Sequence, residues 1–478
     1  MAAGDSQEIP KYEFDVVVVG GGIAGLCAAL TAREAGATVI LAEKAPREER
    51  GGNTRFADAQ IRFPHAADEF GSRSYSEREM IDDLMRISHG RANRALVETL
   101  VRNAADTVEW LSALGVEWER GYPHTAGYRR APQQGGQGLV DTLFRRLEGA
   151  DGVCSYESGA MRLLLDNRRQ VTGVRCTSRD GLVDLMAGGG VVLACGGFQA
   201  NVQMRVAHLG RFADSLILRG SRFNTGDGIR MALEIGALPA GQWGDYHAAV
   251  IDARSPAVEC GVTALYNFQM GIIVNKRGER FLDEGEDFRD HTYVKFGKAI
   301  IEQADGSAFC IFDQQMAQRE EFGRAWRPVG PPIEAATIRE LAQALAIPAE
   351  KLAQTVEAFN QAVQAGEFDL DRLDGKATRG IDPPKSNWAM PLEQPPFIAV
   401  PVTGGITFTF GGLKVDTTAQ VLDLAGAPIA GLYTAGEPMG EIFYYNYPGA
   451  TSVIRGAVYG RIAGGEAARR AREIGAYA

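Results

Sequence analysis

Near its N-terminus the chain carries a strand, a glycine-rich turn, a helix and a second strand in close succession. Val16–Val19 is a β-branched run, and Gly20–Gly25 follows at once with the spacing G-x-G-x-x-G. A helical pattern covers residues 24–35, and a second apolar strand over residues 38–42 ends at Glu43. A continuous β-branched run is typical of a parallel strand buried on both faces. The unit therefore predicts an α/β fold with a doubly wound sheet.

The glycine spacing predicts a dinucleotide site. Gly20 permits the tight turn, Gly22 lets the backbone approach a pyrophosphate, and Gly25 allows the helix to pack closely on the strand. The helix N-terminus directs free N–H groups at the anion. Glu43 follows Gly25 by 18 residues, where a carboxylate can accept hydrogen bonds from ribose hydroxyls. The sequence contains no second G-x-G-x-x-G, so it gives no sign of an NAD(P)H site.

Composition narrows the classes of function. The net charge is −10 without a block of like charge, which argues against a nucleic-acid partner. The six cysteines form no CxxC pair, so we expect neither a metal site nor a disulfide framework. The N-terminus lacks the pattern of a signal peptide, and the apolar run 16–30 is too short and glycine-rich to span a bilayer. We therefore expect a cytoplasmic protein without a transmembrane segment.

The residues after the second strand resemble a flavoprotein family. Lys44-Ala45-Pro46 and then Gly51-Gly52-Asn53-Thr54 are similar to a segment of soluble fumarate reductases, succinate dehydrogenase flavoprotein subunits and 3-ketosteroid dehydrogenases. The resemblance implies that FAD is the cofactor and that this loop wraps the flavin. Members with covalent FAD have a histidine about where Asn53 stands, so the resemblance implies non-covalent FAD.

Further segments extend the resemblance along the chain. Residues 191–198, 224–228 and 431–437 are similar to the family's Gly-Gly strand end, its T-G-D-G element and its late strand with a ribityl-binding glutamate. Residues 384–388 and 405–412 resemble tricarballylate-dehydrogenase-like members. The predicted cofactor-binding residues are Gly20, Gly22, Ala24, Gly25, Glu43, Lys44, Gly52, Asn53, Thr54, Met161, Asp227, Glu437, Ser452 and Val453.

The resemblance also implies a discontinuous FAD-binding domain. Residues 1–240 and 391–478 would form its two parts, and residues 241–390 an inserted α+β cap that covers the substrate. Within the cap, apolar residues at helical spacing predict helix over residues 338–364. Residues 363–384 are rich in Asp, Gly and Pro and predict a loop.

One stretch of the cap is similar to the family segment that carries a catalytic arginine. Residues 271–275 are expected to form a strand, residues 276–279 a turn and residues 280–284 a return strand. The family arginine, a proton donor in fumarate reductases, then corresponds to Arg289. Arginine is an unusual acid or base because its free pKa exceeds ~12. A structural ion pair of Arg289 with Glu284, Asp287 or Asp290 therefore remains an alternative.

Two aromatic residues replace the family's dicarboxylate-binding cations. Phe408 and Tyr447 stand where fumarate reductases have a histidine and an arginine, and residues 264–269 lack the charges of their proton relay. The resemblance therefore implies a less cationic substrate pocket. His247 stands at the place of a substrate-binding histidine. Tyr447-Pro448-Gly449 resembles the ketosteroid dehydrogenase segment whose tyrosine holds the substrate ketone, although the sequence leaves open whether Tyr444, Tyr445 or Tyr447 faces the pocket.

These observations favour an FAD-dependent desaturase. A base, Arg289 or a pocket tyrosine, removes a proton α to a carbonyl or carboxyl group, and the β-hydride goes to flavin. Tyr447 stabilises the enolate and His247 anchors the substrate. Candidate substrates are a small ketone, a keto acid such as 4-oxocyclohexanecarboxylate, or a polycarboxylate such as tricarballylate. The alternatives are an enoate reductase and a flavoprotein electron-transfer subunit; oxygen, a quinone or a redox protein could accept the electrons.

Overall fold

The structure is a computed structural model, and it describes residues 8–70, 73–121, 130–261, 263–324 and 328–475. The helices are α1 (Ile23–Glu34), η1 (Arg47–Glu49), α2 (Gly52–Arg55), α3 (Glu77–Ile87), α4 (Arg94–Ala113), α5 (Gly135–Gly149), α6 (Val202–Leu209), α7 (Asp227–Glu234), η2 (Phe268–Met270), α8 (Arg289–Ile301), η3 (Ala304–Gly306), α9 (Gln314–Ala317), α10 (Glu320–Arg324), α11 (Ile338–Ala344), α12 (Ala349–Ala362) and α13 (Thr451–Glu473). The strands are β1 (Lys11–Val19), β2 (Val39–Ala42), β3 (Trp118–Arg120), β4 (Arg130–Pro132), β5 (Val153–Ser155), β6 (Ala160–Leu165), β7 (Val171–Ser178), β8 (Gly181–Leu193), β9 (Ile217–Leu218), β10 (Pro239–Asp252), β11 (Ile272–Val274), β12 (Ser307–Phe312), β13 (Ile333–Ala335), β14 (Phe397–Leu413), β15 (Gln420–Leu422) and β16 (Pro428–Thr434).

An eight-stranded sheet carries the nucleotide-binding unit. Its main path is β15-β16-β8-β1-β2-β5, and β6 and β7 extend it from β8. Strand β1 pairs in parallel with β2 and β8, and β8 pairs in parallel with β16. Val16–Val19 at the centre of this sheet are almost fully buried, as the β-branched run predicted. The α/β fold class is thereby confirmed.

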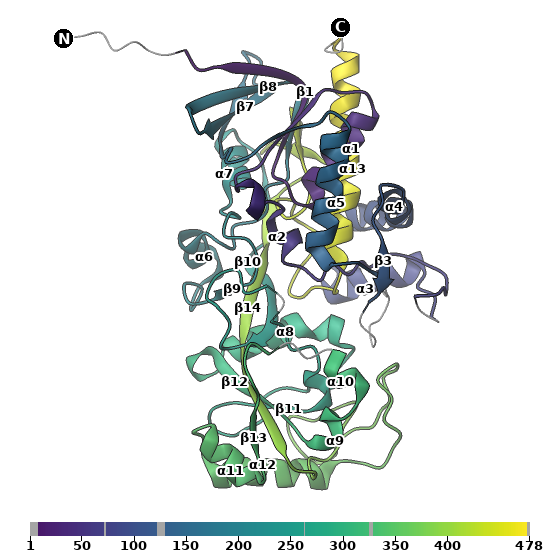
Figure 1. Cartoon of the computed structure of the whole chain (residues 1–478), viewed down its shortest axis with the longest axis vertical. Helices are drawn as coiled ribbons and strands as arrows, with labels where there is room; N and C mark the ends of the chain where they lie inside the picture. Colours follow the sequence, from purple (N-terminus) through teal and green to yellow (C-terminus); the bar gives the residue numbers. More distant parts are fainter. Residues whose placement is uncertain (1–7, 71–72, 122–129, 262, 325–327, 476–478) are drawn as a thin grey trace, which may run out of the picture.

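Helices α1, α5 and α13 lie together beside this sheet (Figure 1). Helix α13 approaches α1 closely because it carries glycines at the contact. A Cβ on Gly460 would lie 2.3 Å from the carbonyl oxygen of Ala24, which no side chain could tolerate. This close packing places the N-terminus of α13 beside the glycine-rich turn, although the two segments lie more than 400 residues apart.

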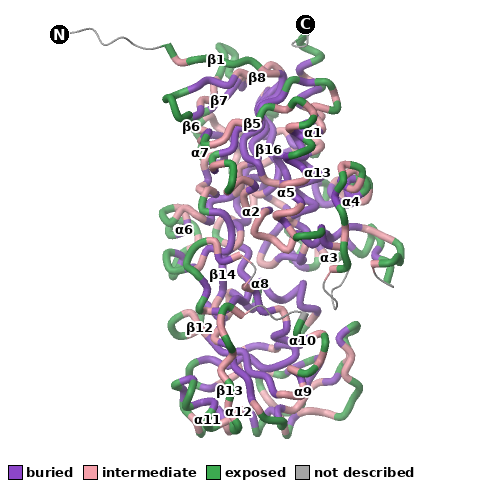
Figure 2. The backbone as a smooth tube through the Cα atoms, viewed as in Figure 1, coloured by how far each residue is buried: buried purple, intermediate pink, exposed green. Residues whose placement is uncertain are grey.

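A six-stranded sheet forms the other half of the molecule. Its path is β10-β14-β12-β11, with β9 and β13 also paired to β14. The long strands β10 and β14 pair antiparallel, and β14 runs from the nucleotide-binding half to the far end of the molecule (Figure 1). Figure 2 shows that buried residues gather around both sheets, whereas the outer helices keep exposed faces. Strand β14 belongs to this sheet although it follows residue 390. The division of the chain into domain segments 1–240, 241–390 and 391–478 stays a prediction.

Of two secondary-structure predictions made for residues 241–390, one is confirmed and one is wrong. The helix expected over residues 338–364 is present as α11 and α12, which are separated at Pro348. The prediction of a return strand at residues 280–284 is wrong, because these residues form no strand and only an isolated bridge joins Val274 to Arg280. The side chain of Arg280 instead pairs with Glu284 and donates to the carbonyl oxygen of Pro383. Residues 280–284 therefore form a loop that these contacts hold in place.

Within the described residues, no helix combines the length and the hydropathy needed to cross a bilayer.

Candidate active site

The first cavity lies where β1, α2, β14 and α13 meet. It has an empty volume of about 1020 Å³. Its lining includes every predicted cofactor-binding residue except Gly25 and Met161. Residues that the sequence reasoning did not single out also contribute, among them Thr407 and Arg455.

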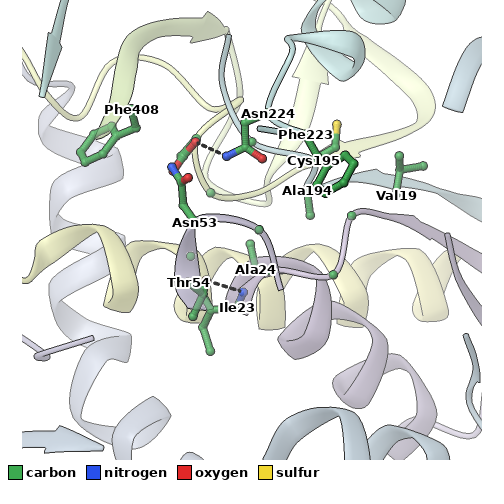
Figure 3. A pocket seen from close by; sticks show the side chains of 18 of the residues that line it. Val19, Ile23, Ala24, Asn53, Thr54, Ala194, Cys195, Phe223, Asn224 and Phe408 are labelled. Carbon is green, nitrogen blue, oxygen red and sulfur yellow. Dashed lines mark hydrogen bonds between the residues drawn. The ribbon is translucent and has the colours of Figure 1, made fainter. Parts of the chain in front are cut away.

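The glycine-rich turn forms one wall of this cavity. A Cβ on Gly25 would lie 1.8 Å from the carbonyl oxygen of Gly20, so Gly25 allows the helix to close on the strand even though it does not line the cavity. The first N–H of α1, on Ile23, donates to Thr54 Oγ1 at 3.0 Å (Figure 3). The loop that contains Thr54 is therefore held directly against the start of the helix, where a pyrophosphate would bind.

Glu43 is held rigidly at the end of β2. Its two carboxylate oxygens accept hydrogen bonds from the N–H groups of Gly21 and Ala45, at 2.8 and 2.9 Å. Burial raises the pKa of Glu43, and these backbone bonds oppose the rise. Lys44 beside it donates to Asp227 Oδ2 at 2.9 Å. The arrangement suits the ribose and adenosine end of a dinucleotide.

Met161 lies elsewhere than expected. It is on β6, and its side chain is 43% exposed and does not line the cavity, whereas the preceding Ala160 does. The pairing of β6 with β7 shifts register between Ala160 and Arg162, and a contact of Met161 with the cofactor stays a prediction. The carbonyl oxygen of Met161 accepts a hydrogen bond from Arg230.

Asn53 and Glu437 close the other end of the first cavity. Asn53 Nδ2 donates to Glu437 Oε1 at 2.6 Å and to the carbonyl oxygen of Thr407 at 2.8 Å. Glu437 Oε2 also accepts from the N–H of Gly197 and from Gln199 Nε2. The side-chain amide of Asn53 is therefore bonded within the protein, and non-covalent attachment of FAD stays a prediction.

A second cavity opens from this end. The two cavities share Asn53, Ala57, Thr407, Phe408, Ser452 and Val453. The second encloses about 700 Å³ of empty space, part of which is open to solvent. All three predicted catalytic residues, His247, Arg289 and Tyr447, line it. A molecule bound here would lie against the end of the first cavity that is remote from Glu43.

His247 is the centre of an aromatic cluster in the second cavity. The register of β10 and β14 sets His247 opposite Phe408, and the two rings stack with centroids 4.8 Å apart. His247 Nε2 lies 2.6 Å from the hydroxyl oxygen of Tyr293. Burial and the charge of Arg219 hold the pKa of His247 well below its ordinary value, so the imidazole is neutral. In the tautomer that leaves Nε2 unprotonated, it accepts a hydrogen bond from the hydroxyl of Tyr293.

Two arginines, not one, line the second cavity. Arg289 begins α8, and its Cζ lies 4.5 Å from the ring centroid of Tyr266. Arg219 Nη1 donates to Thr407 Oγ1 at 2.8 Å, and Arg219 opposes the rise that burial causes in the pKa of Tyr266. Arg219, which the sequence reasoning did not single out, enters the cavity from the segment after β9. The expectation of a pocket less cationic than that of fumarate reductases stays a prediction.

The acids near Arg289 in sequence form ion pairs with other arginines. Glu284 pairs with Arg280, Asp287 with Arg86, and Asp290 with the buried Arg62. These contacts fix the loop before α8.

Of the three neighbouring tyrosines, Tyr447 is the one that lines the second cavity. Its hydroxyl oxygen accepts the N–H of Ser452 at 2.8 Å and lies 3.0 Å from Ser452 Oγ. Burial raises the pKa of Tyr447, and the bonds with Ser452 oppose the rise. The hydroxyl of Tyr445 instead accepts from Arg91.

The described part of the chain contains no group of three or more His, Cys, Asp or Glu side chains that could hold a metal ion. The cofactor is instead indicated by comparison. Residues 15–454 match the family described as FAD binding domain.

Relatives and solved structures extend over nearly the whole chain. Urocanate reductase of Eggerthella lenta is 32% identical over 95% of this chain and 75% of its own length. The 4-oxocyclohexanecarboxylate 2-dehydrogenase of Sinomonas cyclohexanicum is 27% identical over 96% and 94%. The crystal structure of 3-ketosteroid-Δ4-(5α)-dehydrogenase of Rhodococcus jostii superposes with a TM-score of 0.75 at 27% identity, over 98% and 99% of the two chains.

Other relatives are longer, and the chain spans only 50% and 49% of two of them. The family match nevertheless covers both sheets and both cavities. The chain therefore belongs to the FAD binding domain family, and it is an FAD-dependent oxidoreductase.

Proposed function

We propose that the enzyme acts on a CH–CH bond and desaturates a small keto acid next to its carbonyl group. The observation that carries the proposal is the second cavity, which adjoins the flavin end of the first and combines a His–Tyr pair, a buried tyrosine hydroxyl and two arginines. Bound FAD supplies the hydride acceptor. The relative that acts on 4-oxocyclohexanecarboxylate supports this class of substrate.

The charges that line the second cavity favour one carboxylate on the substrate. Arg219 and Arg289 contribute two positive charges, Asp58 contributes one negative charge, and His247 is neutral. The net charge of +1 matches a monocarboxylate, because a buried charge needs a partner. A tricarboxylate such as tricarballylate would leave unpaired negative charge. Phe408 beside the arginines offers apolar contact for a ring.

Proton removal is assigned to Tyr293, with His247 as its partner. The 2.6 Å contact between the two groups lets the phenol pass its own proton to the imidazole as it takes the α-proton. The negative charge of the bound carboxylate and of the enolate would offset the charge of Arg219, which otherwise disfavours the imidazolium. General-base catalysis of this kind typically contributes ~10²–10⁴-fold. Arg289, the other candidate base, is better suited to hold the carboxylate because its guanidinium remains protonated.

Tyr447 is assigned to the developing enolate. The N–H that its oxygen accepts from Ser452 polarises the phenol, so the hydroxyl becomes a stronger donor when it turns to a substrate oxygen. A donor aimed at the oxygen where charge develops lowers the barrier to loss of the α-proton.

A screen with an artificial dye as electron acceptor tests the substrate class. The FAD-loaded protein is given 4-oxocyclohexanecarboxylate, cyclohexanone, which lacks the carboxylate, and tricarballylate. We expect the highest kcat/KM for the keto acid. Turnover of tricarballylate alone would contradict the charge argument, and the absence of turnover with all three would contradict the proposed reaction.

The reverse reaction is the second candidate, because a urocanate reductase is among the relatives. The same residues would then deliver a proton to the α carbon after hydride transfer to the β carbon. Oxidation of the chemically reduced flavoprotein by an α,β-unsaturated acid, together with no dye reduction by any saturated substrate, would favour the reductase.

A further inference from the structure

Arg455 is a buried cation at the flavin end of the first cavity. It lies in the second turn of α13, is 2% exposed and lines the cavity together with Ser452 and Val453. Those two residues also line the second cavity, so Arg455 belongs to the end where substrate meets cofactor. The dinucleotide phosphates are expected at the glycine-rich turn.

Two nitrogen atoms of the Arg455 guanidinium lack a hydrogen-bond acceptor within the described chain. Its Nε and Nη2 atoms are buried and have no hydrogen-bond partner among the described residues. Its Cζ lies 4.7 Å from the ring centroid of Phe443 and 5.6 Å from that of Phe408. Glu437 attracts Arg455 electrostatically, but the oxygens of Glu437 already accept hydrogen bonds from Asn53 and others.

Arg455 remains charged at neutral pH. Burial lowers the pKa of its guanidinium to about 10. A buried cation without a hydrogen-bonded counter-charge is costly, and Arg455 is one of the residues that line the cavity of the cofactor. Its partner is therefore expected to be a group of the cofactor that carries negative charge at least part of the time.

We propose that Arg455 stabilises the negative charge that the isoalloxazine ring gains on reduction, and so raises the reduction potential of bound FAD. The substrate gives the ring a hydride, which is two electrons and one proton, while the α-proton passes to a protein base. The ring then carries one negative charge. A nearby cation favours this state over the neutral oxidised state, whereas a simple cofactor anchor would bind both states equally.

The reduction potential of the FAD-loaded protein tests this role without reference to any substrate. We expect Arg455→Gln to make reduction at least tenfold less favourable, which is about 30 mV for a two-electron couple, and Arg455→Lys to retain most of the potential. The affinity of the oxidised protein for sulfite, which adds to the flavin and leaves negative charge on the ring, is expected to fall at least tenfold in Arg455→Gln.

Arg461 provides a matched control. It lies on the same helix, where its Nη1 donates to Thr107 and its Cζ stands over the ring of Trp110. Arg461→Gln is expected to leave the potential unchanged. An unchanged potential in Arg455→Gln, or weaker FAD binding without a change in potential, would overturn the proposal.

The wild-type protein gives a second test in case Arg455→Gln fails to retain FAD. The dependence of its potential on pH near neutrality is expected to correspond to uptake of one proton per two electrons, because the reduced ring stays anionic. Uptake of two protons per two electrons would overturn the proposal, since the reduced ring would then be neutral.

Discussion

Replacement of Arg219 by Met is expected to reduce activity toward a keto acid selectively. Arg219 Nη1 is held by Thr407, and its Nε is buried without a hydrogen-bond partner in the described chain, so the side chain is pre-positioned with at least one donor for a ligand. A hydrogen bond to a charged group contributes about 1.5–3 kcal/mol. Its loss predicts a fall in kcat/KM of roughly 10- to 150-fold, since 1.36 kcal/mol corresponds to tenfold.

The assay compares the same variant on two substrates. Steady-state dye reduction is measured with 4-oxocyclohexanecarboxylate and with the neutral cyclohexanone, and we expect the second kcat/KM to change by less than about threefold. Arg222→Met is the matched control, because Arg222 is exposed and pairs with Glu259. Equal losses on both substrates would refute the reasoning and make Arg219 a structural residue.

Three further predictions concern the cofactor, the enolate donor and stability. Acid precipitation is expected to release all the yellow colour, because Asn53 stands where covalent members of the family have a histidine and its amide is not a nucleophile; colour left in the pellet would refute this. Tyr447→Phe is expected to lower kcat on the keto acid by ~10²–10³ with FAD retained, and a loss below tenfold would return Tyr447 to a packing role. Burial alone would lower the pKa of His291, but Asp290, Asp287 and Asp83 raise it to about 9. Its stabilising contribution, on the order of 3 kcal/mol, is complete below pH ~6.5 and is lost as the pH rises through about 9. Denaturant unfolding at pH 6 and pH 10 is therefore expected to show a smaller decline in His291→Gln than in the wild type, and equal declines would count against the assignment.

Local constraints made the nucleotide-binding half predictable from the sequence. The strand and the glycine turn leave few alternatives, because Gly25 must admit the carbonyl oxygen of Gly20 at a distance that excludes any Cβ. The placement of His247, Arg289 and Tyr447 in one cavity followed from the resemblance, not from spacing. Met161 differs from these residues, because it is exposed and does not line the first cavity.

The missed residues depend on contacts between distant segments. Arg219 reaches the second cavity because its N–H is bonded to the carbonyl oxygen of Ile406, on β14. Nothing within residues 215–222 indicates that contact. Tyr293 could have been found, because it follows Arg289 by four residues on α8, and residues at that spacing share one face of a helix.

Anaerobic mixing of the FAD-loaded protein with 4-oxocyclohexanecarboxylate tests the central claim most directly. The account predicts that the yellow flavin absorbance is bleached in one step and that the α,β-unsaturated keto acid is formed in equal amount. Persistence of the oxidised flavin spectrum with this and related keto acids, while an α,β-unsaturated acid reoxidises the chemically reduced protein, would contradict it.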